Sequence, residues 1–315
     1  AQLSRGLGDV YKRQAEDRLK LWDKSEGCAL FQSGMAAITT TILELTRPNT
    51  LILHSSPLYG GTDHFIEEVL PKYNIKSMYF DSMKSLKSII EKKNKEFPNL
   101  EVSLVYIESP ANPTNSIVDI EKSKQLADHF STKKDKVYVA IDNTFMGPVF
   151  SHPIDHGADV VLYSATKYIG GHSDLVAGAA CGSNEVISRI KTLRVFMGNM
   201  ASPFTSWLIL RSLETLKLRM EKSAENASKI AEKLKSHKNV DKVHYLGLVS
   251  KDSPEYEIIQ KQYSSPGGMI SFDVKGGEKE AFKFLDNLNL VKLAVSLGGT
   301  AVSYTHLRAH ETVVH

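Results

Sequence analysis

The chain has 315 residues, of which 42% are hydrophobic, and a formal net charge of +3 at pH 7. This length and composition suffice for one large domain or for two domains. The mild charge and the scattered lysines do not indicate nucleic-acid binding, and because no run of about 18 apolar residues occurs, no membrane span is expected.

The two cysteines, Cys28 and Cys181, are too few for a disulfide framework. Such cysteine usage fits a reducing compartment. The first residues also lack the apolar segment of a secretory signal. We therefore expect a cytoplasmic protein.

The two ends of the chain fit no element pattern. Residues 1–14, AQLSRGLGDVYKRQ, and residues 302–315, VSYTHLRAHETVVH, both look similar to translated adaptor sequence. We expect both to be non-native segments and leave them out of the fold prediction. The chain is then a fragment of a longer protein; the alternative is that both ends are ordinary tails.

The first expected elements are two helices. Residues 15–27 form a polar pattern that ends at Gly27, and FQSGMAAI opens a helix that runs to about Leu45. Ser33 is a good N-cap residue, and Gly34 permits close approach to the first turn. The unpaired N–H groups of such a turn bind phosphate well. A plain capped helix fits the pattern equally.

A β/α alternation follows. Apolar runs at 51–54, 76–80, 104–107 and 137–141 predict buried strands, with helices expected at 82–95 and 119–130. Three polar side chains follow strand ends, where functional loops lie in α/β proteins: Tyr59, Asn112 and Asp142. Their ordinary alternatives are a packing tyrosine, an Asx turn and a turn cap.

The stretch at 159–178, DVVLYSATKYIGGHSDLVAG, changes character abruptly. Its apolar run predicts a strand buried on both faces. Ser164, Thr166 and Lys167 follow the strand end, and glycines then permit tight turns. Partial desolvation there lowers the pKa of an amine and makes it a nucleophile toward a carbonyl. A bare lysine in a turn would instead be a solvated surface residue.

The remaining chain predicts a strand at 179–182, a helix at 185–195, and a long helical pattern over 202–235, broken near Arg219. Strands near Val243 and at 267–274 and a helix at 278–288 come last. This order predicts a smaller α+β domain, so we expect domains at 15–235 and 236–301. His152 and His156 have a metal-ligand spacing, but a proline lies between them and no third ligand follows, so no metal site is expected.

The run Ser-Ala-Thr-Lys-Tyr-x-Gly-Gly-His-Ser-Asp resembles the lysine signature of the Cys/Met-metabolism, or trans-sulfuration, family of pyridoxal-phosphate (PLP) enzymes. That family contains cystathionine γ-synthase, cystathionine γ-lyase and methionine γ-lyase. The resemblance implies the type I, aspartate aminotransferase-like α/β fold, with a mostly parallel sheet in a large domain. It also implies the start of a smaller C-terminal domain, PLP as cofactor, an amino-acid substrate, and a homo-oligomer built as a dimer of dimers.

The resemblance also implies a role for each matching residue. Lys167 would hold PLP as a Schiff base and move the α-proton, while Tyr59 would stack on the cofactor and donate a proton. Asn112 would face the phenolic oxygen, and Asp142 would pair with the pyridine nitrogen. The expected phosphate ligands are Ser33, Gly34, Met35, Ser164 and Thr166. Ser296 is expected at the substrate, and His172 is expected to support its own loop.

The implied reaction is γ-elimination or γ-replacement on a sulfur amino acid or an activated homoserine. Val295 stands where many cystathionine-handling members have glutamate, which favours a methionine γ-lyase. Gly61 stands where methionine γ-lyases usually have cysteine, which favours the cystathionine enzymes, including γ-synthase-type trans-sulfuration.

An inactive fragment or a non-catalytic PLP-fold protein is the alternative from another class. The family's N-terminal Tyr-x-Arg is not found upstream of Ala15, and its carboxylate-binding arginine is not found near the other end. Arg308 lies in the expected non-native segment and is not assigned that role. We therefore expect low activity from this chain.

Overall fold

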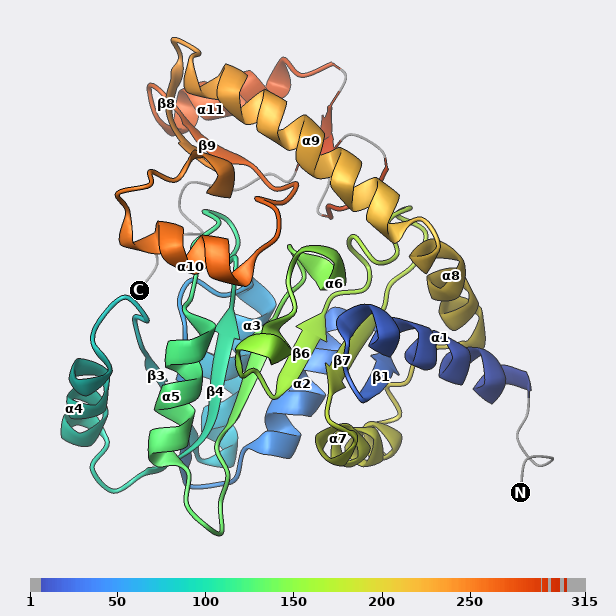
Figure 1. Ribbon diagram of the computed structural model, residues 1–315, viewed down its shortest axis with the longest axis vertical. Coiled ribbons are helices and arrows are strands. Elements are labelled where there is room, and N and C mark those ends of the chain that lie inside the picture. The colour runs from blue at the N-terminus through green and yellow to red at the C-terminus, as the bar shows by residue number, and fades with distance from the viewer. Residues whose placement is uncertain (1–6, 290, 294–295, 301–302, 305–315) are drawn as a thin grey trace.

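The computed structural model describes residues 7–289, 291–293, 296–300 and 303–304. A large α/β region is built around a seven-stranded sheet. A smaller region, with β8 (Val240–His244), β9 (Ser271–Val274) and α11 (Glu278–Asp286), lies beyond it at the top of Figure 1. The long helix α9 (Leu216–Lys235) runs from the large region to the smaller one.

The main sheet has the strand order β1-β7-β6-β5-β4-β2-β3. Its strands are β1 (Gly27–Phe31), β2 (Thr50–His54), β3 (Ile75–Tyr79), β4 (Glu101–Glu108), β5 (Tyr138–Asp142), β6 (Val160–Tyr163) and β7 (Gly178–Gly182). Neighbours pair in parallel from β3 to β6, while β7 is antiparallel to both β6 and β1. The carboxyl ends of β2, β4, β5 and β6 therefore meet at one edge of the sheet.

The central strands are mostly apolar and almost wholly buried because helices cover both faces of the sheet. Every residue of β2 and of β6 is buried. Such runs are typical of parallel strands in α/β proteins. In β7, small residues permit closer packing: a Cβ on Gly178 would lie 2.1 Å from the carbonyl oxygen of Ser33. Strand β7 therefore packs directly against the start of helix α2 (Gly34–Leu45).

Helices of the large region cover the two faces of the sheet and carry the chain between its strands, while α11 lies with β8 and β9 in the smaller region (Figure 1). The helices of the described residues are α1 (Leu7–Asp23), α2 (Gly34–Leu45), α3 (Gly60–His64), α4 (Leu86–Glu96), α5 (Ile120–Phe130), α6 (Gly147–Phe150), α7 (Asn184–Met197), α8 (Pro203–Leu213), α9 (Leu216–Lys235), α10 (Pro254–Gln262) and α11 (Glu278–Asp286). Short 3₁₀ or π turns lie at Phe65–Val69, Leu70–Tyr73, Pro153–His156 and Leu246–Leu248. Ser33 and Asp119 cap α2 and α5 by accepting backbone N–H groups, which stabilises a helix start.

The smaller region pairs β8 (Val240–His244) with β9 (Ser271–Val274) in antiparallel fashion, and β10 (Lys292–Leu293) pairs with β11 (Ser303–Tyr304) in parallel. Asn115 of the large region donates its side-chain amide to the carbonyl oxygens of His244 and Met269, both at 3.0 Å. These bonds fasten the smaller region to the loop that follows β4.

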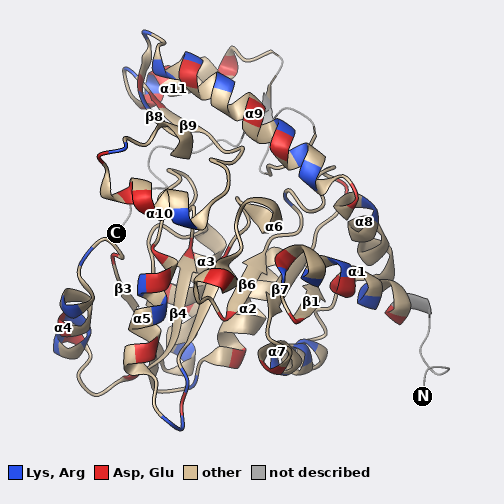
Figure 2. Ribbon diagram, in the orientation of Figure 1, with Lys and Arg blue, Asp and Glu red and all other residues tan. Residues whose placement is uncertain are grey.

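Charged side chains of both signs alternate along α9 (Figure 2). Glu225 illustrates this pattern, since it pairs with Lys222 at 2.8 Å and with Lys229 at 2.5 Å. None of the helices in the described ranges is long and apolar enough to cross a membrane.

Three predictions about the N-terminal half of the chain need correction. Residues 7–14, which we expected to fit no element, continue helix α1 toward the N-terminus, and its Ala15 and Leu19 are fully buried. That helix ends at Asp23 instead of Gly27. The following strand β1 was missed, because a run of five apolar residues next to a helix start is easily read as part of the helix.

The C-terminal half brings three further corrections. The long helical pattern breaks at Glu214 and Thr215, between α8 and α9, and not near Arg219. Helix α10 was not predicted at all, although it has Ser253 as its N-cap and a proline in its first turn. The predicted strand at 267–274 forms only over Ser271–Val274.

Candidate active site

The side chains singled out in the sequence converge on the carboxyl edge of the sheet. Tyr59 follows β2 and directly precedes α3, and Asn112 follows β4. Asp142 is the last residue of β5, and Lys167 lies four residues after the end of β6. Ligands of open α/β sheets bind at this edge, because the loops that leave parallel strands meet there.

The start of α2 packs against the loop that follows β6. A Cβ on Gly34 would lie 2.9 Å from both Cβ and Oγ of Ser164, so the two segments could not approach so closely with a larger residue there. Ser33 caps the helix, and its Oγ accepts from the backbone N–H of Ala36 at 3.0 Å. The N–H groups of Gly34 and Met35 belong to the first turn, which has no acceptor within the helix. This helix start can therefore bind an anion.

Tyr59 presents an aromatic ring at the same edge. Its side chain is 47% exposed, although Leu58 and Thr62 close to it in the chain are buried. A Cβ on Gly61 would lie 2.9 Å from both Sδ of Met35 and Cε1 of Tyr59. The tyrosine ring thus stands beside the start of α2, with a face available for stacking.

Glu108, the last residue of β4, holds two loops of the site in place. Its Oε2 accepts from the backbone N–H of Tyr59 at 2.6 Å, and its Oε1 accepts from the backbone N–H of Asn112 at 3.1 Å. Burial and the negative charge of Asp142 together raise the pKa of Glu108 to about 8. No role was predicted for Glu108 from the sequence; its position directly before Ser-Pro was the available signal.

Asp142 is buried and lies opposite Glu108 in the strand register. Its Oδ1 accepts from Thr144 twice, from the backbone N–H at 2.9 Å and from Oγ1 at 2.6 Å. Thr144 Oγ1 in turn accepts from the backbone N–H of Ser164 at 2.8 Å. Thr144 therefore links the carboxylate to the lysine loop, a role that the sequence analysis missed.

The carboxyl group of Asp142 has a raised pKa. Burial, which raises the pKa, outweighs the hydrogen bonds from Thr144 and the positive charge of Lys167, which lower it. A buried carboxylate in this balance is stabilised by a further cationic partner. A protonated ring nitrogen is one such partner.

Lys167 is half-buried, and its Nζ donates to Oγ of Ser296 at 3.1 Å. Burial lowers the pKa of its amine, and the charge of Asp142 opposes that change. The segment that carries Ser296 packs on the lysine loop: a Cβ on Gly298, which has φ +80, would lie 2.7 Å from the backbone nitrogen of Tyr168. Ser296 thus contacts Lys167, while Val295 lies outside the described residues.

Arg219, at the start of α9, fixes the same loop from the other side. Its Nη1 donates to the carbonyl oxygen of Tyr168 at 2.6 Å, and its Nη2 donates to that of Ser212 at 2.9 Å. The loop makes room for the guanidinium at Gly171, where φ is +69 and a Cβ would lie 1.9 Å from Nη1. The sequence analysis noted Arg219 only as a helix break.

Two predicted residues bond within the lysine loop. Thr166 donates its hydroxyl to the carbonyl oxygen of Ala177 at 3.2 Å and accepts from the N–H of Ala177 at 3.1 Å. His172 Nδ1 lies 2.8 Å from the carbonyl oxygen of Gly170, in line with the expected support of the loop. The hydroxyl of Thr166 therefore already has a donor and an acceptor partner.

These groups fit PLP. The site combines an anion-binding helix start, a buried carboxylate suited to a protonated pyridine nitrogen, an aromatic ring, and a half-buried amine. A seven-stranded, mostly parallel sheet with this edge is the large domain of a type I PLP enzyme.

The family follows from comparison with known proteins. The family model described as Cys/Met metabolism PLP-dependent enzyme matches residues 7–313. This range is wider than residues 15–301, which the two expected domains cover. The chain belongs to this family, and PLP is its cofactor.

Similar proteins come from several branches of the family. The chain is 36% identical to the L-methionine gamma-lyase of Porphyromonas gingivalis over 304 residues, which cover 95% of this chain and 73% of that protein. It is 36% identical to the cystathionine gamma-lyase of Homo sapiens over 295 residues, 93% of this chain and 69% of that protein. The solved cystathionine gamma synthase of Xanthomonas oryzae pv. oryzae, in complex with aminoacrylate and cysteine, superimposes with a TM-score of 0.86 at 29% identity, covering 98% of this chain and 77% of that one.

Proposed function

We propose that the carboxyl edge of the sheet catalyses PLP-dependent γ-elimination or γ-replacement on a sulfur amino acid or an activated homoserine, with Lys167 as the catalytic lysine. The observation that carries this proposal is the environment of Lys167. Its amine is half-buried, has a lowered pKa, and is held by Ser296. In its neutral form such an amine reacts with a carbonyl and accepts a proton, and a lowered pKa favours that form.

Each remaining residue has a task in this proposal. Bound PLP supplies a ring that stabilises negative charge on the substrate's α-carbon. Asp142 keeps the pyridine nitrogen protonated through its buried carboxylate. Lys167 Nζ would take the α-proton, and Tyr59 would stack on the cofactor ring and give a proton to the leaving group. Asn112 would face the phenolic oxygen, from a loop that Glu108 holds.

The phosphate of the cofactor belongs at the start of α2. The N–H groups of Gly34 and Met35 and the hydroxyl of Ser164 are its proposed donors, and the close packing of Gly34 on Ser164 brings them together. Uncharged donors suffice, because phosphate accepts several hydrogen bonds. Ser33 contributes mainly by capping the helix.

A second candidate is γ-replacement of the cystathionine γ-synthase type. Gly61 favours this reaction, because the resemblance associates glycine at this position with the cystathionine enzymes. A side chain there would also have to displace Met35 or Tyr59, each only 2.9 Å from the position of its Cβ. The similarity to L-methionine gamma-lyase supports the first candidate.

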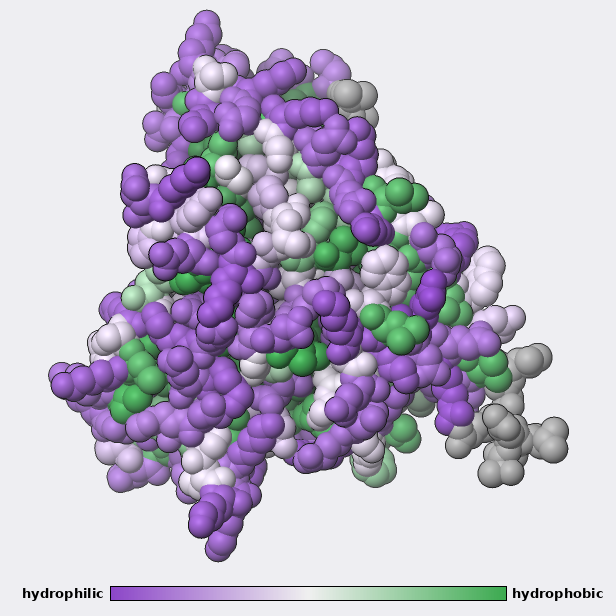
Figure 3. Space-filling model, in the orientation of Figure 1, coloured by the Kyte–Doolittle hydropathy of each residue, from purple (hydrophilic) through white to green (hydrophobic). Residues whose placement is uncertain are grey.

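The end of α7 and the start of α8 support a homo-oligomer. Phe196 is 81% exposed and Phe204 is 67% exposed, and Val195, Met197 and Trp207 are exposed beside them. Apolar surface interrupts the hydrophilic surface where α1 and α8 lie in Figure 3. Because a monomer rarely exposes so many large apolar side chains together, we infer that a second copy covers them, as in a dimer of dimers.

We also infer a reducing compartment such as the cytoplasm. Cys28 and Cys181 are both buried free thiols. The two cysteines lie opposite one another in the register of β1 and β7, and they pack in the core as small apolar side chains.

Visible absorbance of the purified chain with added PLP tests the proposed lysine. We expect a cofactor band in the parent that borohydride makes permanent, and no such band in Lys167→Ala. Lys217→Ala is the matched control, since Lys217 is exposed on α9. A permanent band of equal strength in Lys167→Ala would rule out Lys167. Methionine, cystathionine, cysteine and acylated homoserines then decide between elimination and replacement.

A further inference from the structure

A cavity of about 250 Å³ lies at the opposite, amino edge of the sheet. It is bounded by the end of α4, the start of β4 and the end of α5. Pro98, Leu100, Val102 and Phe130 form apolar walls, and Arg47, Glu101 and Asp135 supply charges. None of these residues belongs to the candidate active site.

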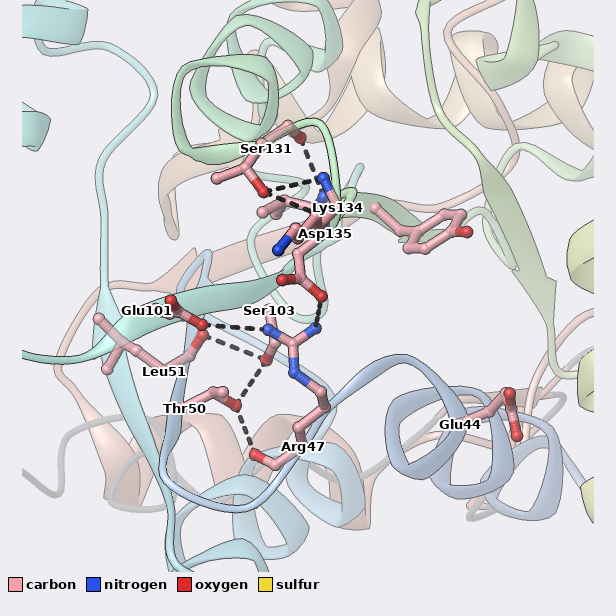
Figure 4. Close-up of polar contacts among 12 residues, drawn as sticks. Glu44, Arg47, Thr50, Leu51, Glu101, Ser103, Ser131, Lys134 and Asp135 are labelled. Atoms are coloured by element: carbon pink, nitrogen blue, oxygen red, sulfur yellow. Dashed lines mark hydrogen bonds and ion pairs between the residues drawn. The ribbon is translucent and has the colours of Figure 1, made fainter.

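The positive charge of Arg47 is already neutralised. Its Nη2 lies 3.3 Å from Oε2 of Glu101, and its Nη1 lies 3.1 Å from Oδ1 of Asp135. Figure 4 shows the guanidinium between these two carboxylates, one from the start of β4 and one from the loop after α5. This guanidinium therefore has no need of a further anion.

Lys93 also lines the cavity but has no such partner. It lies in the last turn of α4 and is only 6% exposed. Its Nζ lies 5.3 Å from the centroid of the Phe130 ring, and among the described residues no hydrogen bond or ion pair reaches this ammonium. Contact with a ring offsets only part of the cost of burying an ammonium. An anion in the cavity would supply the missing interaction.

The surroundings restrict which anion fits. A single unpaired ammonium matches a single negative charge. Since Glu101 and Asp135 together carry one more charge than Arg47 neutralises, they repel an anion of higher charge more strongly than a monoanion. The apolar walls suit a short hydrocarbon body. A cavity of about 250 Å³ has room for such a ligand.

We propose that this cavity is a binding site for a small monocarboxylate with a short apolar body. The carboxylate bonds to Nζ of Lys93, and the body lies against Phe130, Pro98 and Leu100. The site is independent of the proposed reaction, because it lies at the other edge of the sheet.

Calorimetric titration of the PLP-loaded chain with butyrate tests this proposal. We expect saturable binding that weakens about tenfold or more in Lys93→Met, because the charge-assisted bond is lost. Lys95→Met is the matched control, exposed on the same helix, and should bind as the parent does. Butyramide, which has the same shape without the charge, and inorganic phosphate should both bind more weakly than butyrate.

Three results would overturn the proposal: no saturable binding of butyrate, equal binding by Lys93→Met, or tighter binding of phosphate than of butyrate. A footprint on the unmutated chain gives a second readout that does not depend on how Lys93→Met folds. Butyrate should slow the modification of Lys93 by an amine-reactive reagent, and butyramide should not. An unchanged rate at Lys93 while butyrate binds would place the carboxylate elsewhere.

Discussion

Two partly or fully buried lysines, Lys167 and Lys93, stand at opposite edges of one sheet and differ in what surrounds them. Burial lowers the pKa of both Lys167 and Lys93. At the carboxyl edge, Asp142 faces the ammonium of Lys167 and Ser296 accepts a hydrogen bond from it. At the amino edge, the ammonium of Lys93 faces only the ring of Phe130 among the described residues.

From this difference we infer that desolvation alone does not make an amine catalytic. Lys167, the proposed catalytic residue, also has a fixed direction, because Ser296 holds its Nζ and Arg219 holds the backbone next to it. Lys93 has the same chemistry without these constraints, and its cavity is suited to binding only. The difference arises because loops from several parallel strands meet at the carboxyl edge.

Of the changes that test this difference between the two lysines, removing the charge of Asp142 should have the largest effect on activity. In Asp142→Asn, the pKa of Lys167 falls further, because the charge that opposes its decrease is gone. The pyridine nitrogen also loses its anionic partner, so we expect kcat/KM to fall by about 10²- to 10³-fold, the usual effect of one electrostatic group. Steady-state kinetics on the best substrate measure this effect. Asp128→Asn, an exposed change on α5, is the control, and equal losses in both variants would contradict the assigned role.

Filling the space at Gly34 should have the next largest effect. The added Cβ of Gly34→Ala would lie 2.9 Å from Ser164 and separate the start of α2 from the lysine loop. We expect PLP affinity to fall about tenfold, since such overpacking costs about 1–3 kcal/mol. Gly60→Ala is the matched control, because a Cβ there meets nothing within 4 Å. Fluorescence titration with PLP measures both, and unchanged affinity in Gly34→Ala would argue against a phosphate at this helix start.

The raised pKa of Glu108 should make the free energy of unfolding depend on pH. Its pKa is raised from 4.5 to about 8, so the folded chain binds one more proton than the unfolded chain between these values. The free energy of unfolding therefore falls as pH rises through this range, by about 1.4 kcal/mol per pH unit from this group. Urea unfolding of the PLP-free chain from acidic to alkaline pH should show a smaller slope for Glu108→Gln. An identical slope would mean that Glu108 does not carry the extra proton.

Ser296→Ala should have the smallest effect. It removes the hydrogen bond to Nζ of Lys167 but leaves the charge of Asp142 in place. We expect kcat/KM to fall about fivefold, in proportion to one hydrogen bond of about 1 kcal/mol. The pH dependence of kcat/KM should keep its shape, because the charges around Lys167 are unchanged. A loss as large as that of Asp142→Asn would show that Ser296 does more than hold the amine.

Local patterns predicted much of the large region. The apolar run at 104–107 lies inside β4, and the cap at Ser33 begins α2 as expected. Strand β1 was missed because its apolar run is short and directly precedes a helix. The break in the long helical pattern was placed too late, since no glycine or proline marks the residues where it occurs.

The missed site residues all act across long stretches of chain. Glu108 bonds to the backbone of Tyr59, and Arg219 bonds to that of Tyr168, 49 and 51 residues away. Thr144 joins Asp142 to Ser164 across neighbouring strands. Neither propensity nor periodicity carries such information, because both describe only residues close together along the chain.

The sequence alone was sufficient to indicate the family, the strand end that carries Lys167 and the helix start that suits a phosphate. These features depend on residues within one short segment, where local sterics and hydrogen bonding decide the conformation. Only the tertiary structure decided which buried charges have partners. It placed Asp142 near Lys167 and left Lys93 beside Phe130, because the free energy of a buried charge depends on groups brought from distant parts of the chain.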